Sequence, residues 1–172
     1  MSASATPASS SRSCTGGLSE DYVALQRAAE AEGFRVTVGA LIFDAAGRVF
    51  VHRRGWDRAL FPGSWDIVGG HVEPGETLLE ALAREVEEET GWRVVGTPDL
   101  AHVGEWEGRR EFDFLVDVEG DLDNPRLELP EHIDFRWVQP AELPLLDDTG
   151  YADEGLIARV VELNGRRSSP GA

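Results

Sequence analysis

The sequence predicts an α/β domain in which a mixed β-sheet is flanked by helices. The 172 residues suit one domain with a single core, and a hydrophobic content of 41% with 28% charged residues is that of a globular protein. Strand and helix patterns follow the order β, β, β, helix, β, β, β, helix, mostly with connections short enough for hairpins. This order favours a mixed sheet covered by helices over a ladder of parallel β-α-β units.

The two ends of the chain differ from the rest in composition. Residues 1–17 are mainly Ser, Ala, Thr and Gly, and we expect a disordered tail there. Residues 165–172 form a similar C-terminal tail, which leaves 18–164 as the domain. A short helix is expected from Ser19 to Glu32, between an N-cap serine and a terminating glycine. This helix either covers the core or meets a second copy of the chain in a homodimer.

Three strands are expected next. Arg35–Asp44 and Arg48–Arg53 are rich in β-branched and apolar residues, and the turn between them predicts a hairpin. The loop 55–64 contains Pro and Gly and separates this hairpin from a short strand at Trp65–Val68. That strand leads directly into a pair of glycines, 69 and 70.

An amphipathic helix is predicted from Thr77 to Thr90. Leu78, Leu82 and Val86 recur at helical spacing and form an apolar stripe. Gly91 follows as a natural C-terminal stop.

The opposite face of this helix carries Glu85, Glu88 and Glu89. Offsets of three and four place these side chains on one face, one turn apart. Like charges at that spacing destabilise an isolated helix. The face is therefore either left in solvent or held by a cation, and oxygen-only ligands suit Mg²⁺, Mn²⁺ or Ca²⁺.

The second half of the chain repeats the alternation. Leu100–Trp106 and Glu111–Val118 predict a second hairpin around residues 107–110. Asp134–Val138 predicts a last strand, and Asp153–Leu163 a final amphipathic helix.

Charge and cysteine content exclude several classes of protein. The net charge is -16, with 32 acidic and 16 basic residues, which argues against binding a nucleic-acid polymer or an anionic membrane. Cys14 is the single cysteine, so no intramolecular disulfide or cysteine-built zinc site can form. No apolar run approaches the roughly 20 residues of a membrane span, and the N-terminus lacks a secretory h-region. A cytoplasmic location is expected.

The stretch from Gly70 to Trp92, GHVEPGETLLEALAREVEEETGW, resembles the Nudix box, GX5EX7REUXEEXGU, where U is a bulky aliphatic residue. Glu76 matches the first glutamate, residues 84–89 the REUXEE core and Gly91 the last glycine. Trp92 departs from the pattern because it is aromatic, although still bulky and apolar. The resemblance implies the family's α/β/α sandwich, and its activity of hydrolysing a small-molecule diphosphate linked to a moiety X.

The resemblance also implies a metal centre. Glu85 and Glu89 match the family's metal ligands and Glu88 a third, with Mg²⁺, or alternatively Mn²⁺, as the ion. Gly70 allows the backbone to approach the ligand or metal closely, and its free carbonyl can coordinate.

Arg84 and Glu76 resemble the pair that braces the box loop against the helix, and Arg84 joins the catalytic set. Some family members use a glutamate of the box as the base, here Glu88, and others a glutamate from a later loop. Glu131 is the candidate for the later position, and Glu111 is its rival.

Other residues are candidates for substrate contacts. Arg53 and Arg54 end a strand that leads to the box and could clamp phosphate, although surface arginines look the same. Trp106 and Phe112 could stack on a nucleobase or belong to the core. His71 lies inside the box loop without a role that the pattern indicates.

The subclass within the family is harder to assign than the family itself. The run FPGSWDIVGG at residues 61–70 is similar to the arm of isopentenyl-diphosphate-isomerase-like relatives, but isomerases need a catalytic cysteine in the core and Cys14 lies in the tail. We therefore expect a hydrolase of nucleoside di- or triphosphates or their derivatives. The alternatives are a catalytically silent ligand-binding or regulatory module, and a relative that acts on isoprenoid diphosphates. The intact glutamates favour the hydrolase.

Overall fold

The computed structural model describes residues 15–146 and 154–167. Cys14 and Asp153 therefore lie outside the described residues. In chain order the elements are α1 (Thr15–Ala31), β1 (Arg35–Ile42), β2 (Val49–Arg54), β3 (Trp65–Asp66), β4 (Val68–His71), α2 (Leu78–Thr90), β5 (Arg93–Trp106), β6 (Arg109–Glu119), β7 (His132–Val138), the 3-10 helix η1 (Pro140–Leu145) and α3 (Glu154–Arg167).

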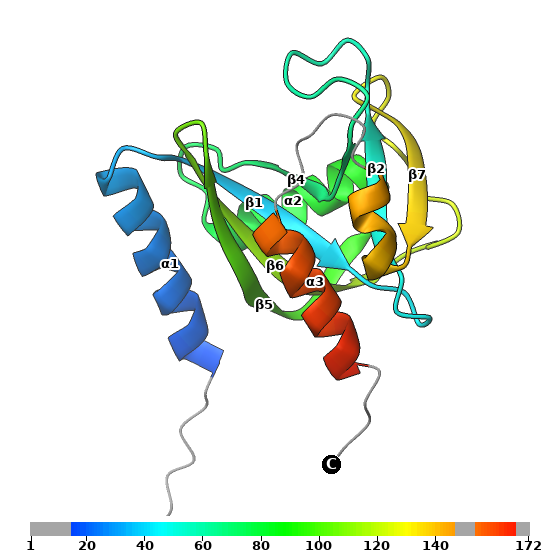
Figure 1. Ribbon diagram of the computed structural model, residues 1–172. Helices are drawn as coiled ribbons and strands as arrows, with labels where there is room; N and C mark the ends of the chain where they lie inside the picture. The colour runs from blue at the N-terminus through cyan, green and yellow to red at the C-terminus, as the bar shows by residue number, and fades with distance from the viewer. Residues whose placement is uncertain (1–14, 147–153, 168–172) are drawn as a thin grey trace, which may run out of the picture.

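The strands form two sheets between helices (Figure 1). The larger sheet has the order β4-β1-β6-β5, and it is mixed because β1 and β6 run parallel. The smaller sheet has the order β3-β2-β7 and is antiparallel. The α/β class predicted from the sequence is confirmed, but its strands divide between two sheets.

The predicted hairpin of β1 and β2 is wrong. The turn forms, since the Gly47 amide donates to the Asp44 carbonyl oxygen at 3.1 Å, but only an isolated bridge between Phe43 and Val49 continues it. Because β1 is already paired with β4 on one edge and β6 on the other, it has no free edge for β2. The chain therefore crosses from one sheet to the other at this turn.

The short strand predicted at Trp65–Val68 is likewise two strands in different sheets. In β3, Asp66 lies opposite His52 of β2. In β4, Val68 lies opposite Ala40 of β1. Only one residue separates the two strands, so the segment that enters the box is anchored to both sheets.

The second hairpin, β5 with β6, is confirmed. Glu107 and Gly108 connect the strands with positive φ angles of 43° and 75°, as a type I′ turn requires. β5 begins at Arg93, before the expected Leu100, with irregular pairing between the two. Pro98 lies within the irregular stretch, and proline obscures a strand pattern because it cannot donate to the ladder.

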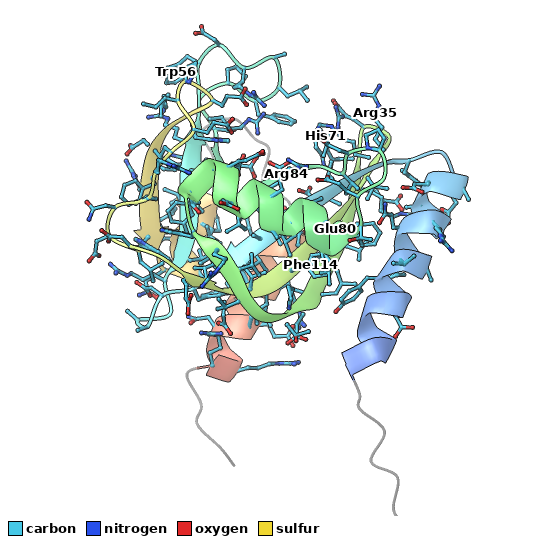
Figure 2. The ribbon with its side chains drawn as sticks, turned by 180° about the vertical axis from the view of Figure 1, so that it is seen from behind. Arg35, Trp56, His71, Glu80, Arg84 and Phe114 are labelled. Carbon is cyan, nitrogen blue, oxygen red and sulfur yellow. The ribbon has the colours of Figure 1, made fainter. Side chains whose placement is uncertain are left out.

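Helices cover both faces of the mixed sheet. Figure 1 shows α3 in front of it, and Figure 2, from behind, shows α2 across the other face. Alternate residues of β1 supply both layers: Val38 and Ala40 belong to the cluster that includes α2, and Leu41 to the cluster that includes α3. A strand buried on both faces reads as a continuous apolar run, which is how this segment appears in the sequence.

The acidic helix is confirmed as α2. Thr77 is its N-cap and forms a capping box with Glu80, while Gly91 ends it in a left-handed conformation. Leu82 and Val86 are fully buried, so the apolar stripe is fixed against the sheet. The opposite face is thereby held toward the box loop.

Helix α1 packs against the rest of the domain. The Gln26 side chain donates to the Glu76 carbonyl oxygen at 2.9 Å and accepts from the Leu78 amide at 3.1 Å. The Tyr22 ring packs edge-on against Phe114 with centroids 5.2 Å apart. These contacts support the covering role, and the homodimer stays a prediction.

Both terminal helices are longer than expected. α1 starts at Thr15, inside the stretch expected as a tail, and α3 continues to Arg167. Gly16, Gly17 and Gly165 are poor helix formers, so the sequence pattern does not extend that far.

Within residues 15–146 and 154–167, no helix has the length and apolar character needed to cross a membrane.

Candidate active site

An acidic cavity of about 240 Å³ lies beside the polar face of α2. The three predicted metal ligands line it, together with Gly70, Arg84 and Glu131. The full set of described lining residues is Arg58, Gly69, Gly70, His71, Glu73, Arg84, Glu85, Glu88, Glu89, Glu128 and Glu131. The fold therefore gathers most of the predicted site into one place, and six glutamates face two arginines there.

Glu89 is the most deeply buried carboxylate of this cavity, with 4% of the residue exposed. The Gly69 amide donates to its Oε2 at 2.9 Å. Nε2 of His132 lies 3.4 Å from Oε1, and Nε2 of His52 lies 4.0 Å from Oε2. Burial raises the pKa of Glu89 well above its usual value, opposed by the Gly69 amide. A neighbouring cation would restore the ionised form.

The two histidines form a stacked pair that the sequence does not indicate. Their ring centroids are 3.8 Å apart with an interplanar angle of 8°. His52 is 1% and His132 2% exposed. Burial lowers the pKa of both, that of His132 to about 4, so both are neutral at pH 7. They come from β2 and β7, far apart in the sequence, which is why local pattern misses them.

Arg84 braces the site as the resemblance implies. It binds the Glu76 carboxylate through two contacts, Nε to Oε1 at 2.8 Å and Nη2 to Oε2 at 3.0 Å. It also donates to Glu85 Oε1 at 2.8 Å, Glu88 Oε2 at 3.0 Å and the His71 carbonyl oxygen at 2.9 Å. One guanidinium thus joins the box loop to the helix.

The backbone at Gly70 lies against Glu85. A Cβ atom at residue 70 would be 2.3 Å from Oε1 of Glu85, so this close approach needs glycine. Burial raises the pKa of Glu85, whereas Arg84 opposes the shift. The carboxylates of Glu85, Glu88 and Glu89 line one cavity, and carboxylate oxygens are ligands that Mg²⁺ and Mn²⁺ prefer, so the cavity fits such an ion.

Two further glutamates reach the cavity from the segment before β7. Glu131 forms an ion pair with Arg58. Glu128 lines the same cavity and was not foreseen, since nothing distinguishes it from surface charge in the sequence. Glu111, the rival base, lies in the neighbouring pocket, where its Oε2 accepts from Trp106 Nε1 at 3.1 Å.

That second pocket adjoins the acidic cavity and shares residues 69–71 and Arg58 with it. Its described lining comprises Thr37, Arg54, Arg58, Leu60, Phe61, Asp66, Ile67, Gly69, Gly70, His71, Trp106 and Glu111. The Trp106 ring packs edge-on against Phe61 with centroids 5.7 Å apart. The Arg109 guanidinium lies 4.4 Å from the Trp106 ring centroid. An indole fixed in this way can offer a surface to a planar group.

The two predicted phosphate-binding arginines have different surroundings. Arg54 lines the second pocket, with Nη1 3.3 Å from Asp66 Oδ2. Arg53 borders neither cavity: it stacks 4.8 Å from the Trp56 ring centroid and donates to the Gly63 carbonyl oxygen at 2.9 Å. A register irregularity between residues 53 and 54 redirects the strand there. The position of Arg53 does not support a phosphate contact.

The two aromatic residues considered for base stacking, Phe112 and Trp106, have different positions. Phe112 is 2% exposed and belongs to the core, so the alternative of a stacking role is wrong. Trp106 lines the second pocket, and its stacking on a nucleobase stays a prediction. His71 borders both cavities, although the sequence assigned it no role.

Comparisons with known proteins agree with this geometry. A family model described as the NUDIX domain matches residues 33–160. Nucleoside triphosphatase NudI from Salmonella schwarzengrund (strain CVM19633) is 34% identical over 106 residues, which cover 53% of this chain and 72% of that protein.

Solved structures show the same fold. The MutT protein from Methanosarcina mazei Go1 is similar with a TM-score of 0.61 and 28% identity, over 79% of this chain and 96% of that one. A structure from work on MutT of Aliivibrio salmonicida and Vibrio cholerae has a TM-score of 0.62 at 24% identity, over 75% and 98%; it supports the fold alone. The chain therefore belongs to the NUDIX family and is a MutT-like Nudix pyrophosphohydrolase, which hydrolyses nucleoside diphosphate derivatives.

Proposed function

We propose that this enzyme is a Mg²⁺-dependent hydrolase of nucleoside triphosphates or closely related nucleotides, with Mn²⁺ as an alternative ion. The observation that carries the proposal is the convergence of Glu85, Glu88 and Glu89 on one cavity beside Gly70. The name of the similar NudI protein, a nucleoside triphosphatase, supports the substrate class. The net charge of -16 favours a small nucleotide over a nucleic-acid polymer or a membrane surface.

The three glutamates would hold the ion, with the Gly70 carbonyl oxygen as a backbone ligand. A bound divalent cation neutralises the diphosphate oxygens and lowers the pKa of a water molecule. Arg84 orients two of the carboxylates, Glu85 and Glu88, through its contacts at 2.8 and 3.0 Å. Its role is positioning, because its donors are committed to protein oxygens.

Glu131 is the proposed proton acceptor. It lines the same cavity as the metal-binding carboxylates and pairs with Arg58, and it comes from the segment before β7 and not from α2. Glu88, half exposed at 50% of its side chain, is the box glutamate that could act instead. Glu111 is less well placed, since it lies in the adjoining pocket. Comparing Glu131→Gln with Glu88→Gln and Glu128→Gln at saturating Mg²⁺ identifies the base, because its loss lowers kcat most.

The moiety linked to the diphosphate would occupy the second pocket. Trp106 supplies a stacking surface for a nucleobase, and Arg54 borders the same space. Because the two cavities share residues 69–71, a molecule with its phosphates beside α2 can extend directly into this pocket.

The test is Glu89→Gln, which keeps the shape of the side chain and removes its charge. Glu87→Gln is the matched control, since Glu87 lies on the same helix but is exposed and outside the cavity. We expect Glu89→Gln to abolish Mg²⁺-dependent nucleotide hydrolysis with an intact fold by circular dichroism, and Glu87→Gln to remain active. Full activity in Glu89→Gln would refute the metal assignment.

The substrate is identified with a panel of nucleotides, dinucleoside polyphosphates, nucleotide sugars and prenyl diphosphates, each with added Mg²⁺. We expect turnover of nucleoside triphosphates to monophosphate and pyrophosphate. Turnover of prenyl diphosphates alone would instead indicate an isoprenoid-acting relative. Binding without turnover of any compound would indicate a catalytically silent module.

A further inference from the structure

Glu89 has a different environment from the other two proposed metal ligands. Arg84 contacts Glu85 and Glu88, whereas Glu89 is approached by the Gly69 amide and two buried imidazoles. We propose that His132, supported by His52, is a positioning residue for Glu89: its Nε2–H fixes one carboxylate oxygen while the Gly69 amide fixes the other. The inference rests on the proposed function in one respect, namely that Glu89 binds a cation.

Each oxygen of Glu89 has its own neighbour. The Gly69 amide donates to Oε2 at 2.9 Å, and His132 Nε2 lies 3.4 Å from Oε1. Only 5% of the Glu89 side chain and 3% of the His132 side chain are exposed. With so little contact with water, the carboxylate depends on protein donors to hold its orientation.

The surroundings of the rings decide which nitrogen carries the proton. Nδ1 of His52 and Nδ1 of His132 are buried without a hydrogen-bond partner among the described residues. A proton on Nδ1 of His132 would be a buried donor without an acceptor, and it would turn an Nε2 lone pair toward the Glu89 carboxylate. A proton on Nε2 removes both penalties, because the ring then presents a donor to the carboxylate oxygen.

His52 fixes the plane of the His132 ring. The two rings are parallel within 8° and their centroids are 3.8 Å apart. Because His52 lies in β2 and His132 in β7, which pair side by side, the stack is built on rigid backbone.

The same three residues could instead hold a metal directly, since their ligand atoms lie within 4.8 Å of one another. The ring geometry argues against this. A metal bound by imidazole lies in the ring plane, about 2.0 Å from the nitrogen, and two nearly parallel planes with centroids 3.8 Å apart share no such point. If His132 instead donates to Glu89, and Glu89 alone of the three residues binds the ion, neither imidazole ring has to move.

Metal binding without substrate tests this directly. Mn²⁺ affinity is measured by electron paramagnetic resonance in the wild type, His132→Leu, His132→Gln and Glu89→Gln, with urea unfolding in parallel. We expect His132→Leu to weaken Mn²⁺ binding by about 10- to 100-fold with no loss of stability. His132→Gln should recover most of the affinity, because its carboxamide again offers an N–H donor. His102→Leu is the control, since His102 pairs with Asp113 at 3.0 Å and lines neither cavity.

The outcomes separate the two claims. Weak Mn²⁺ binding in Glu89→Gln with unchanged binding in His132→Leu would overturn the positioning role alone. Unchanged binding in both variants would overturn the metal assignment as well. Spin-echo modulation from a directly bound imidazole nitrogen in the Mn²⁺-loaded wild type would replace positioning with coordination. Its absence, together with recovery in His132→Gln, supports the proposal.

Discussion

Gly70 and Glu85 are so close that a side chain at residue 70 would displace the Glu85 carboxylate. A Cβ atom there would lie 2.3 Å from Oε1 and 2.5 Å from Cδ of Glu85. Glu85 cannot move away freely, because Arg84 holds the same Oε1 at 2.8 Å. The backbone and the carboxylate are thus positioned by their contact with each other.

We therefore expect Gly70→Ala to displace the Glu85 carboxylate and lower Mg²⁺-dependent kcat/KM by about 10-fold or more, the usual cost of disturbing a metal ligand. Steady-state kinetics over a range of Mg²⁺ concentrations measures this. Gly165→Ala is the control, since Gly165 lies in α3 with nothing within 4 Å of a Cβ atom. Equal activity in the two variants would contradict the contact's importance.

Removing the indole of Trp106 tests the second pocket. Base stacking on an aromatic side chain contributes about 1–3 kcal/mol, so we expect Trp106→Leu to raise the nucleotide KM by at least about 5-fold. Mn²⁺ affinity without substrate should not change, because Trp106 lines the second pocket and not the acidic cavity. Trp56→Leu is the matched control: Trp56 is 64% exposed and lines neither cavity. An unchanged KM in Trp106→Leu would remove the stacking role.

Asp66 should make stability depend on pH. Burial raises its pKa from 3.8 to about 6, opposed by Arg54. Between these pH values the folded protein keeps a proton that the unfolded chain has released. The free energy of unfolding therefore falls as pH rises from about 4 to about 6, and the loss persists above that range.

Replacing Asp66 by Asn removes this loss. We expect Asp66→Asn to be more stable than wild type at pH 7.5 by about 1–2 kcal/mol, less than the full shift implies, because 30% of the side chain is exposed and solvent screens it. At pH 4 the two proteins should be nearly equal. Urea unfolding at both pH values measures the difference. Asp117→Asn, at an exposed position of β6, controls for the loss of one negative charge. A stability difference between Asp66→Asn and wild type that does not change with pH would contradict the role given to the raised pKa of Asp66.

Leu82 connects the acidic helix to the core. It is fully buried, and its truncation to Ala leaves a cavity that costs about 2–5 kcal/mol. Urea unfolding should show this loss for Leu82→Ala. Leu25→Ala, on the 40% exposed Leu25, should cost below about 1 kcal/mol. Equal losses would mean that α2 is not held by its apolar stripe.

The local sequence was enough to predict helix α2. The capping threonine, the stripe of Leu82 and Val86, and Gly91 all act within a few residues of one another, so helix limits and the acidic face are readable without tertiary information. The division of the strands between two sheets could not be predicted in this way. It depends on β1 being occupied on both edges, and strand pairing between distant segments leaves no local pattern.

The candidate site divides in the same way. The box supplies Glu85, Glu88 and Glu89 at fixed spacing, and the sequence identifies them. Arg58 reaches the cavities from a loop, and the two histidines reach Glu89 from β2 and β7. Only the folded chain brings these residues together. A histidine that continues a run of buried apolar residues in a strand, as His52 does after Phe50 and Val51, was the one available signal.

Ile67 is the only residue between β3 and β4, which belong to different sheets. The backbone that follows it, residues 69–71, forms a wall common to both cavities. The distance from the carboxylates to the second pocket is therefore set by main-chain pairing in two sheets and not by side-chain conformation. Residues 55–64 connect β2 to β3 of the smaller sheet, and among them Arg58 must be kept because it pairs with Glu131. Substitutions elsewhere in this loop should therefore leave the carboxylates of α2 in place, and we expect them to alter selectivity for the attached group without disturbing the hydrolytic centre.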